Sequence, residues 1–246
     1  MSLKIVVLAK QVPDTRNVGK DAMNADGTIN RAALPAIFNP EDLNALEQAL
    51  RLKDTHPGST VTILTMGPGR AAEIIREGLY RGADNGYLLT DRAFAGADTL
   101  ATSYALATAI KKIGDYDLII GGRQAIDGDT AQVGPQVAEK LGLTQITYTE
   151  EVLNVDEEAR QITVKRHIDG GVETVVGPLP IVLTVNGDLA SFFIHVQYFF
   201  SISDLSQAQL FCYLRTYLSG ITIDSLTTTN NQIIVTDFLD GCSQGI

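Results

Sequence analysis

One short segment of this chain gathers polar side chains of the kind that bind a nucleotide. The apolar run 118–120 predicts a buried strand, which ends at the glycine pair 121–122 and leads to a helix that we expect Thr130 to cap. A glycine-rich passage from a strand to a helix start offers free N–H groups and a helix dipole to an anion. The segment therefore predicts a nucleotide-phosphate site, against the alternative of an ordinary strand-to-helix connection. Five polar residues favour the site over a simple turn: Gln124, Asp127, Asp129, Thr130 and Gln132.

Better-known nucleotide and catalytic motifs are missing from the sequence. There is no Gly-Lys-Ser/Thr triplet, and no Gly-x-Gly-x-x-Gly follows a predicted strand. The only cysteines are Cys212 and Cys242, and with three histidines they suggest neither a metal site nor a disulfide framework. We therefore expect a bound nucleotide without phosphoryl-transfer machinery, and no catalytic residues.

The amino-acid composition and net charge restrict the kinds of molecule that this protein is expected to bind. The 246 residues are 45% hydrophobic and 20% charged, as in ordinary globular proteins, and the net charge is -10. This charge argues against nucleic acid or an anionic membrane and is compatible with a basic protein surface. No signal peptide and no apolar run of about 20 residues is visible, so we expect a cytoplasmic protein without membrane insertion.

Strand and helix patterns alternate through the first two-thirds of the chain. This alternation predicts an α/β fold, with a parallel twisted sheet covered by helices on both faces and ligands bound beyond the carboxyl ends of the strands. Two further loops, 9–14 and 65–69, follow predicted strands and could reach the same edge, while Asn39 is expected to cap the next helix. The expected strands are 4–9, 60–65, 86–89 and 118–121, and the expected helices are 40–54, 71–81, 98–113 and 130–141.

The pattern changes between residues 151 and 185. Alternating apolar residues, a turn at 169–171 and a second alternating run predict a β-hairpin insert over 162–176, followed by one more strand at 179–185. We expect the hairpin at the rim of the sheet. Its polar residues are interpreted as a solvated face and not as a catalytic cluster: Arg166, His167, Asp169 and Glu173.

Several segments, in a fixed order, resemble one known family. The matching segments are 7–14, 39–40 with the helix that follows, 65–68, 82–84, 122–127 and Val164-Lys-Arg-His-Ile-Asp-Gly-Gly-Val-Glu173. Together they resemble the β subunit of electron transfer flavoprotein over roughly residues 3–189. The resemblance implies an adenine nucleotide α-hydrolase-like, Rossmann-like fold that binds AMP, or a second FAD in electron-bifurcating members.

The same resemblance implies the site and the partners. Residues 123–135, with 90–102 upstream, look like the bifurcating type, so FAD is expected and AMP is the alternative. The implied partners are an FAD-carrying α subunit in a heterodimer, acyl-CoA or other dehydrogenases, ferredoxin or flavodoxin, and NADH; the chain would be an electron carrier. The residues implied to touch the nucleotide are Ala9, Asn39, Asp42, Met66, Gln124, Asp127, Asp129, Thr130, Gln132, Val133 and Gly134.

The last 57 residues depart from the family. We expect residues 1–189 to form the nucleotide-binding domain and 190–246 a divergent tail, which has no lysine and holds nine of the sixteen aromatic residues. Two origins are open for the tail, a changed reading frame or a β-rich appendage. Two other roles also remain open, a stand-alone adenine-nucleotide-binding module and a non-functional product that has lost its native end.

Overall fold

A computed structural model describes residues 2–14 and 34–187 of the chain. The domain division at residue 189 and both predictions about the tail concern residues outside this range. Within the described ranges, none of the helices is long and apolar enough to cross a membrane.

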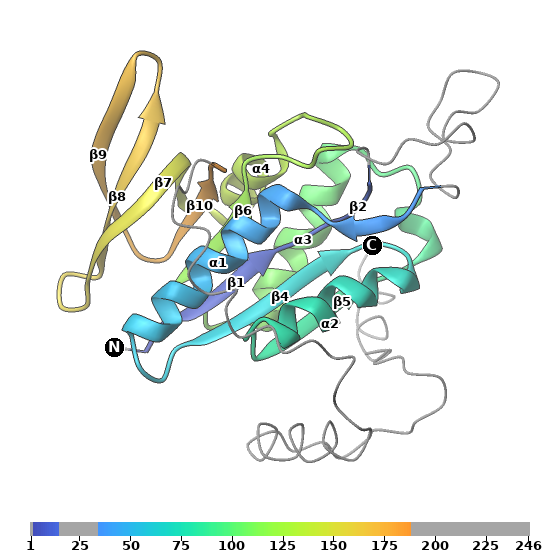
Figure 1. The fold of residues 1–246 in the computed structure, drawn as a ribbon, viewed down its shortest axis with the longest axis horizontal. Coiled ribbons are helices and arrows are strands. Elements are labelled where there is room, and N and C mark those ends of the chain that lie inside the picture. Colours follow the sequence, from blue (N-terminus) through green and yellow to red (C-terminus); the bar gives the residue numbers. More distant parts are fainter. Residues whose placement is uncertain (1, 15–33, 188–246) are drawn as a thin grey trace, which may run out of the picture. The chain divides into compact units, whose positions relative to one another are not determined.

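An eight-stranded sheet forms the centre of the fold (Figure 1). Its order is β5-β4-β1-β6-β10-β7-β8-β9, in which neighbours from β5 to β7 run parallel and the last two pairings are antiparallel. The predicted parallel sheet is therefore confirmed, with an antiparallel extension at one edge. The strands are β1 (Lys4–Leu8), β4 (Thr60–Met66), β5 (Asn85–Leu89), β6 (Leu118–Gly122), β7 (Thr144–Asp156), β8 (Gln161–Ile168), β9 (Gly171–Pro178) and β10 (Ile181–Val185).

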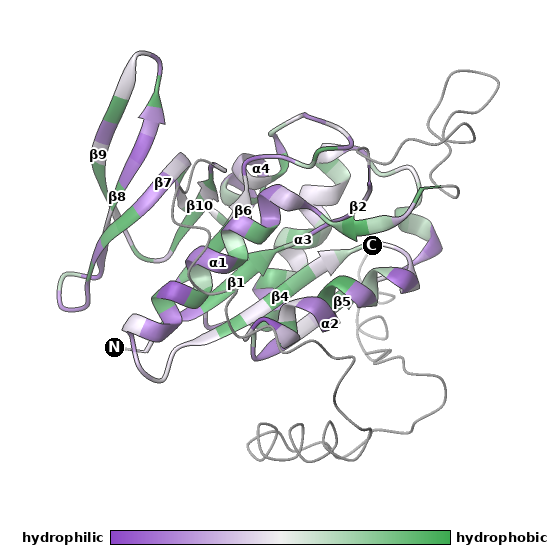
Figure 2. Cartoon of the chain, viewed as in Figure 1, coloured by the Kyte–Doolittle hydropathy of each residue, from purple (hydrophilic) through white to green (hydrophobic). Residues whose placement is uncertain are grey.

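The central strands are buried on both faces, which explains their continuous apolar runs. In β1, Ile5 and Val7 join one hydrophobic cluster while Val6 and Leu8 join another, as the two-residue period of a strand requires. Figure 2 shows the contrast between these mainly hydrophobic strands and the mixed colouring of the β8–β9 hairpin. The two clusters are the cores above and below the sheet.

Helices cover both faces, as predicted. The cluster around Ile5 contains residues of α1 (Pro40–Thr55) and α2 (Ala72–Tyr80), and the cluster around Val6 contains residues of α3 (Thr99–Ile113) and α4 (Val133–Leu141). Two short 3₁₀ turns, η1 (Gly69–Ala71) and η2 (Arg92–Phe94), complete this set.

The strand order reverses between β1 and β6. From β1 the chain adds β4 and β5 on one side, and it then crosses to the other side to place β6 beside β1. Such a reversal opens a crevice at the carboxyl ends of the two strands, the usual place for a ligand in an open α/β sheet. The loops that leave β1 and β6 therefore meet at the position expected for a binding site.

The hairpin prediction is confirmed, and its neighbour was missed. β8 and β9 pair antiparallel from Gln161 with Pro178 to Ile168 with Gly171, at the sheet edge. β7 was not predicted because register shifts between Thr149 and Glu151 and between Val152 and Asn154 break its alternation.

A second, small sheet was also missed. β2 (Gln11–Pro13) pairs antiparallel with β3 (Ala36–Phe38). These strands have three residues each, too few to show a period in the sequence. Their pairing brings the start of α1 next to the loop after β1, where the backbone N–H of Asn39 donates to the Lys10 carbonyl at 2.9 Å.

Candidate functional site

The end of β1 and the loop after β6 are joined through Lys10. Its ammonium lies 2.6 Å from Asp127 Oδ1, and its backbone N–H donates to Asp42 Oδ2 at 2.8 Å. The Asp127 side chain is only 3% exposed, whereas that of Lys10 is 45% exposed. The ion pair therefore neutralises an acidic side chain near the carboxyl ends of β1 and β6, which would otherwise repel a phosphate.

Asn39 holds the loop after β6 through its side-chain amide. Its side chain is fully buried, where Nδ2 donates to the carbonyl of Gln124 at 2.9 Å and Oδ1 accepts from the N–H of Ile126 at 3.2 Å. Asn39 does occupy the N-cap position of α1, but its side chain makes no cap hydrogen bond. The predicted cap position of Asn39 is thus confirmed, but its Oδ1 accepts from Ile126 instead of from an N–H of the first turn of α1.

Asp42 connects the same two loops through its carboxylate. Oδ2 accepts from the N–H of Lys10 at 2.8 Å, and Oδ1 accepts from the N–H of Gly122 at 3.1 Å. Burial raises the pKa of Asp42 to about 7, although hydrogen bonds from Asn39, Lys10 and Gly122 and the charge of Lys10 oppose the rise. A carboxyl in this setting titrates close to neutral pH.

The close contact between β6 and α1 depends on Gly122. A Cβ at this position would lie 2.5 Å from the backbone carbon of Glu41 and 2.6 Å from Asp42 Oδ1. Only a glycine lets the helix start approach the strand end so closely. The sequence marked this residue as a strand end, but the requirement for a missing side chain appears only in three dimensions.

The loop from residue 124 to 132 is held by its own polar groups. Gln124 Nε2 donates to Asp129 Oδ1 at 2.8 Å, and the N–H groups of Gly128 and Asp129 both donate to the Ala125 carbonyl. Asp129 and Ala131 have φ angles of 47° and 52°, in the left-handed region that non-glycine residues rarely adopt. Such strained backbone is typical of functional loops.

The helix after this loop begins later than predicted. α4 starts at Val133, and Gln132 and not Thr130 takes the N-cap position. The Thr130 prediction was wrong because the left-handed residues on either side of it interrupt the helical turn. Gln132 Oε1 accepts from Thr99 Oγ1 at 2.9 Å, which ties the loop to α3.

This helix start is suited to an anion. Gln132 makes no side-chain cap hydrogen bond, so the first N–H groups of α4, at Val133 and Gly134, lack a capping side chain within the part of the chain that the structure describes. Gly134 is required here, since its Cβ would lie 2.6 Å from Thr184 Cγ2 of β10. The donor set therefore fits a nucleotide phosphate, held by backbone N–H groups and the helix dipole.

The sequence-predicted residues lie around one edge of the sheet. Ala9 follows β1, Met66 ends β4 beside it, and the residues from Gln124 to Gly134 belong to the loop after β6 and the start of α4. Asn39 and Asp42 lie behind these loops at the start of α1. Sequence reasoning placed Lys10 in the loop after the first strand and Gly122 at a strand end, but it missed that both residues tie these segments to α1.

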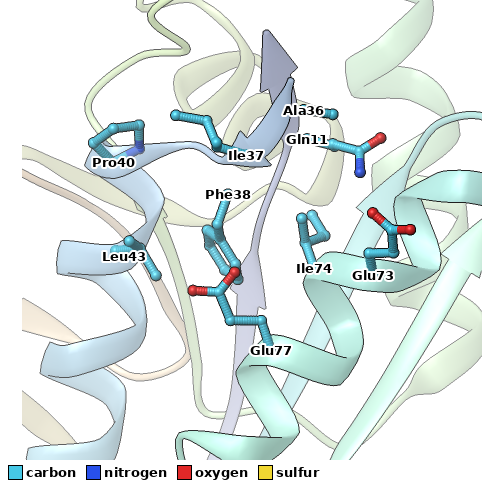
Figure 3. Close-up of a pocket in the computed structure, with 9 residues that line it drawn as sticks. All are labelled: Gln11, Ala36, Ile37, Phe38, Pro40, Leu43, Glu73, Ile74 and Glu77. Carbon is cyan, nitrogen blue, oxygen red and sulfur yellow. The ribbon is translucent and has the colours of Figure 1, made fainter. Parts of the chain in front are cut away.

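A hollow of about 380 Å³ lies apart from the helix start of α4. It lies between α1, α2 and the β2–β3 pair, where Phe38 and Ile74 form its apolar wall and Glu73 and Glu77 its acidic side (Figure 3). Two carboxylates disfavour a phosphate there, so the loop edge is the better site for an anion. A second hollow, of about 790 Å³, lies along η2 and the first turns of α3. The described ranges contain no cluster of three or more residues suited to a metal ion.

Comparison of the sequence with known proteins identifies the family that this chain resembles. A family model described as the electron transfer flavoprotein domain matches residues 26–192. The caffeyl-CoA reductase-Etf complex subunit CarD of Acetobacterium woodii is 50% identical over 182 residues, 74% of this chain and 68% of that protein. The electron transfer flavoprotein subunit beta of Clostridium acetobutylicum is 50% identical over 187 residues, 76% of this chain and 70% of the relative.

The alignments differ in how far they extend. Protein FixA of Azorhizobium caulinodans is 50% identical over 187 residues, and the match covers 66% of its length. The chain thus spans about two thirds of the length of several relatives. The subunit beta of Thermoanaerobacterium thermosaccharolyticum aligns over 94% of this chain at 43% identity, so that alignment continues into the tail.

Proposed function

This chain belongs to the electron transfer flavoprotein family, and we propose that it serves there as a β-type subunit with an adenine-containing nucleotide at the carboxyl edge of β1 and β6. The observation that carries the proposal is the uncapped start of α4, held by joined loops at the point where the strand order reverses. This is the arrangement in which open α/β sheets bind nucleotide phosphates.

Each part of the edge has a separate role in the proposed complex. The N–H groups at the start of α4 would meet phosphate oxygens, while Ala9 and Met66 would border the nucleotide from the neighbouring strand ends. Lys10 would keep Asp127 neutralised. The contacting residues in this proposal are Ala9, Met66, Gln124, Asp127, Asp129, Thr130, Gln132, Val133 and Gly134.

The preferred nucleotide is FAD, with AMP as the alternative. The motif at 123–135 resembles electron-bifurcating members, and two relatives carry the names caffeyl-CoA reductase-Etf complex subunit and acryloyl-CoA reductase electron transfer subunit. A bound FAD supplies redox chemistry that the protein side chains lack. The chain's own part is to bind and orient the nucleotide and to limit its contact with water.

The proposed partner is an α subunit that carries its own FAD, in a heterodimer. Electron donors and acceptors would then be acyl-CoA or other dehydrogenases, ferredoxin or flavodoxin, and NADH, all met in the cytoplasm. An electron carrier of this type needs no general base or nucleophile of its own.

Co-purification of the full chain with an α-type subunit from a matching operon tests this proposal. Bound nucleotides are released with acid, separated by chromatography and counted per complex. Two FAD per complex is the expected result, and one FAD with one AMP would select the AMP alternative. A complex whose only nucleotide is the α-subunit FAD would contradict the proposed site, and the absence of any complex would contradict the proposed pairing.

A further inference from the structure

Asp42 lies at the junction of three segments that surround the proposed site. It belongs to the first turn of α1, and its two oxygens accept from Lys10 after β1 and from Gly122 at the end of β6. The residue is 7% exposed. A bidentate contact of this kind fixes the separation of two loops that are over a hundred residues apart in the sequence.

Asn39 extends the same junction toward α4. Both of its amide atoms bond to the backbone of residues 124 and 126, and it also hydrogen-bonds to Asp42. With these bonds made, the polar atoms of Asn39 and Asp42 point to the loop backbones. Among the described residues the Lys10 ammonium bonds to Asp127 and not to Asp42, so the Asp42 carboxylate would also repel a nucleotide phosphate.

We propose that Asp42 and Asn39 are positioning residues, which hold the loops after β1 and β6 at the spacing the nucleotide needs without touching the nucleotide. This inference rests on the proposed function, and it departs from the direct contacts that the family resemblance implies for these two residues. The ionised carboxylate is the state that locks the loops. Both of its oxygens can accept a backbone N–H, whereas the protonated oxygen of a neutral carboxyl is a poor acceptor.

Protonation of Asp42 should therefore loosen the site close to neutral pH. Lys10 is the charged group that acts on Asp42 directly, and its ammonium is shared with Asp127. Glu41, the preceding residue of α1, pairs with Arg123 after β6. Its pKa of about 7 lies midway between pH 6 and pH 8. If only the ionised form is competent to bind, the affinity for a nucleotide should fall up to about tenfold from pH 8 to pH 6.

Stability should change in the opposite direction. The folded-state pKa lies above the ordinary value of 3.8, so the folded chain holds a proton that the unfolded chain releases. The contribution of Asp42 to stability is thus fully present below pH 4 and is lost as the pH rises through about 7. Protonation of Asp42 thus weakens nucleotide binding while it stabilises the fold, whereas general acid unfolding lowers both.

The experiment measures FAD affinity of the full chain by fluorescence titration at pH 6, 7 and 8. FAD is the probe because its two phosphates are joined as a pyrophosphate, and neither carries the second proton of a monoester, which titrates near pH 6. The wild type should lose up to about tenfold in affinity toward pH 6. Asp42→Asn should bind about tenfold more weakly at pH 8 and show a flat profile, because its amide N–H faces a backbone N–H. Glu47→Gln removes a carboxylate of the same helix that pairs with Arg51, and it should keep the wild-type profile.

The outcomes separate the inference from the proposed function. A flat profile in the wild type, or an Asp42→Asn profile equal to that of the wild type, overturns the positioning role and leaves nucleotide binding in place. A wild type that binds neither FAD nor AMP at any pH overturns the proposed function. Amide hydrogen exchange of Lys10 and Gly122, measured without nucleotide, is a second readout. The protection factors of these two amides, which correct for the intrinsic effect of pH on exchange, should be lower at pH 6 than at pH 8. Equal protection factors at the two pH values would contradict the positioning role of the ionised Asp42.

Discussion

Replacement of Gly122 with alanine should destabilise the fold and weaken nucleotide binding together. The new Cβ would lie within 2.5 to 2.7 Å of the Glu41 backbone and Asp42 Oδ1, so the start of α1 must move away from β6. Overpacking against backbone costs roughly 1–3 kcal/mol, and the hydrogen bond from Gly122 to Asp42 would be strained as well. Urea unfolding should show this loss, and FAD affinity should fall by about tenfold or more.

Gly128→Ala is the matched control for this change. It lies in the same loop, where an added Cβ has no atom within 4 Å, so stability and affinity should stay near the wild-type values. If Gly122→Ala behaves like Gly128→Ala in both assays, the close approach of α1 to β6 is not a requirement of the site.

Replacement of Asn39 with alanine should have the second large effect. The change removes both hydrogen bonds to the loop after β6 and leaves the Gln124 carbonyl and the Ile126 N–H without these partners. Because these two groups are only partly buried, we expect a loss of roughly 1–3 kcal/mol in the free energy of unfolding. The pKa of Asp42 should also rise further, since Asn39 favours its ionised form.

The control for Asn39→Ala is the same substitution at an exposed asparagine. Asn154→Ala, on the solvent side of β7, should change the free energy of unfolding by less than about 0.5 kcal/mol. Equal unfolding curves for the two variants would show that Asn39 does not support the loop.

Much of the fold could be predicted because period and composition act locally. The runs that became β1 and β6 are apolar on both faces, and the breaks after them carry glycine and proline, so the sequence favoured a parallel sheet covered on both faces. β7 escaped prediction because its bulges interrupt the alternation on which strand prediction depends.

The site was only partly predictable for a different reason. The polar residues of the loop after β6 stand out in the sequence. The backbone hydrogen-bond partners of the Asn39 and Asp42 side chains, however, lie between 32 and 87 residues away along the chain. Local rules therefore assigned Asn39 to a helix cap and Thr130 to a helix start. Asn39 does take the cap position, although its side chain bonds to a distant loop, whereas left-handed backbone on either side of Thr130 overrode the local preference there.

The central claim, that an adenine nucleotide binds at the edge of β1 and β6, is tested most directly by hydrogen–deuterium exchange of the full chain with and without saturating FAD, and in parallel with AMP. Slower exchange is predicted for residues 9–11, 66–68 and 128–134, with the β8–β9 hairpin unchanged. Exchange that slows instead around Phe38 and Ile74, or nowhere in these loops, would contradict the assignment of the site.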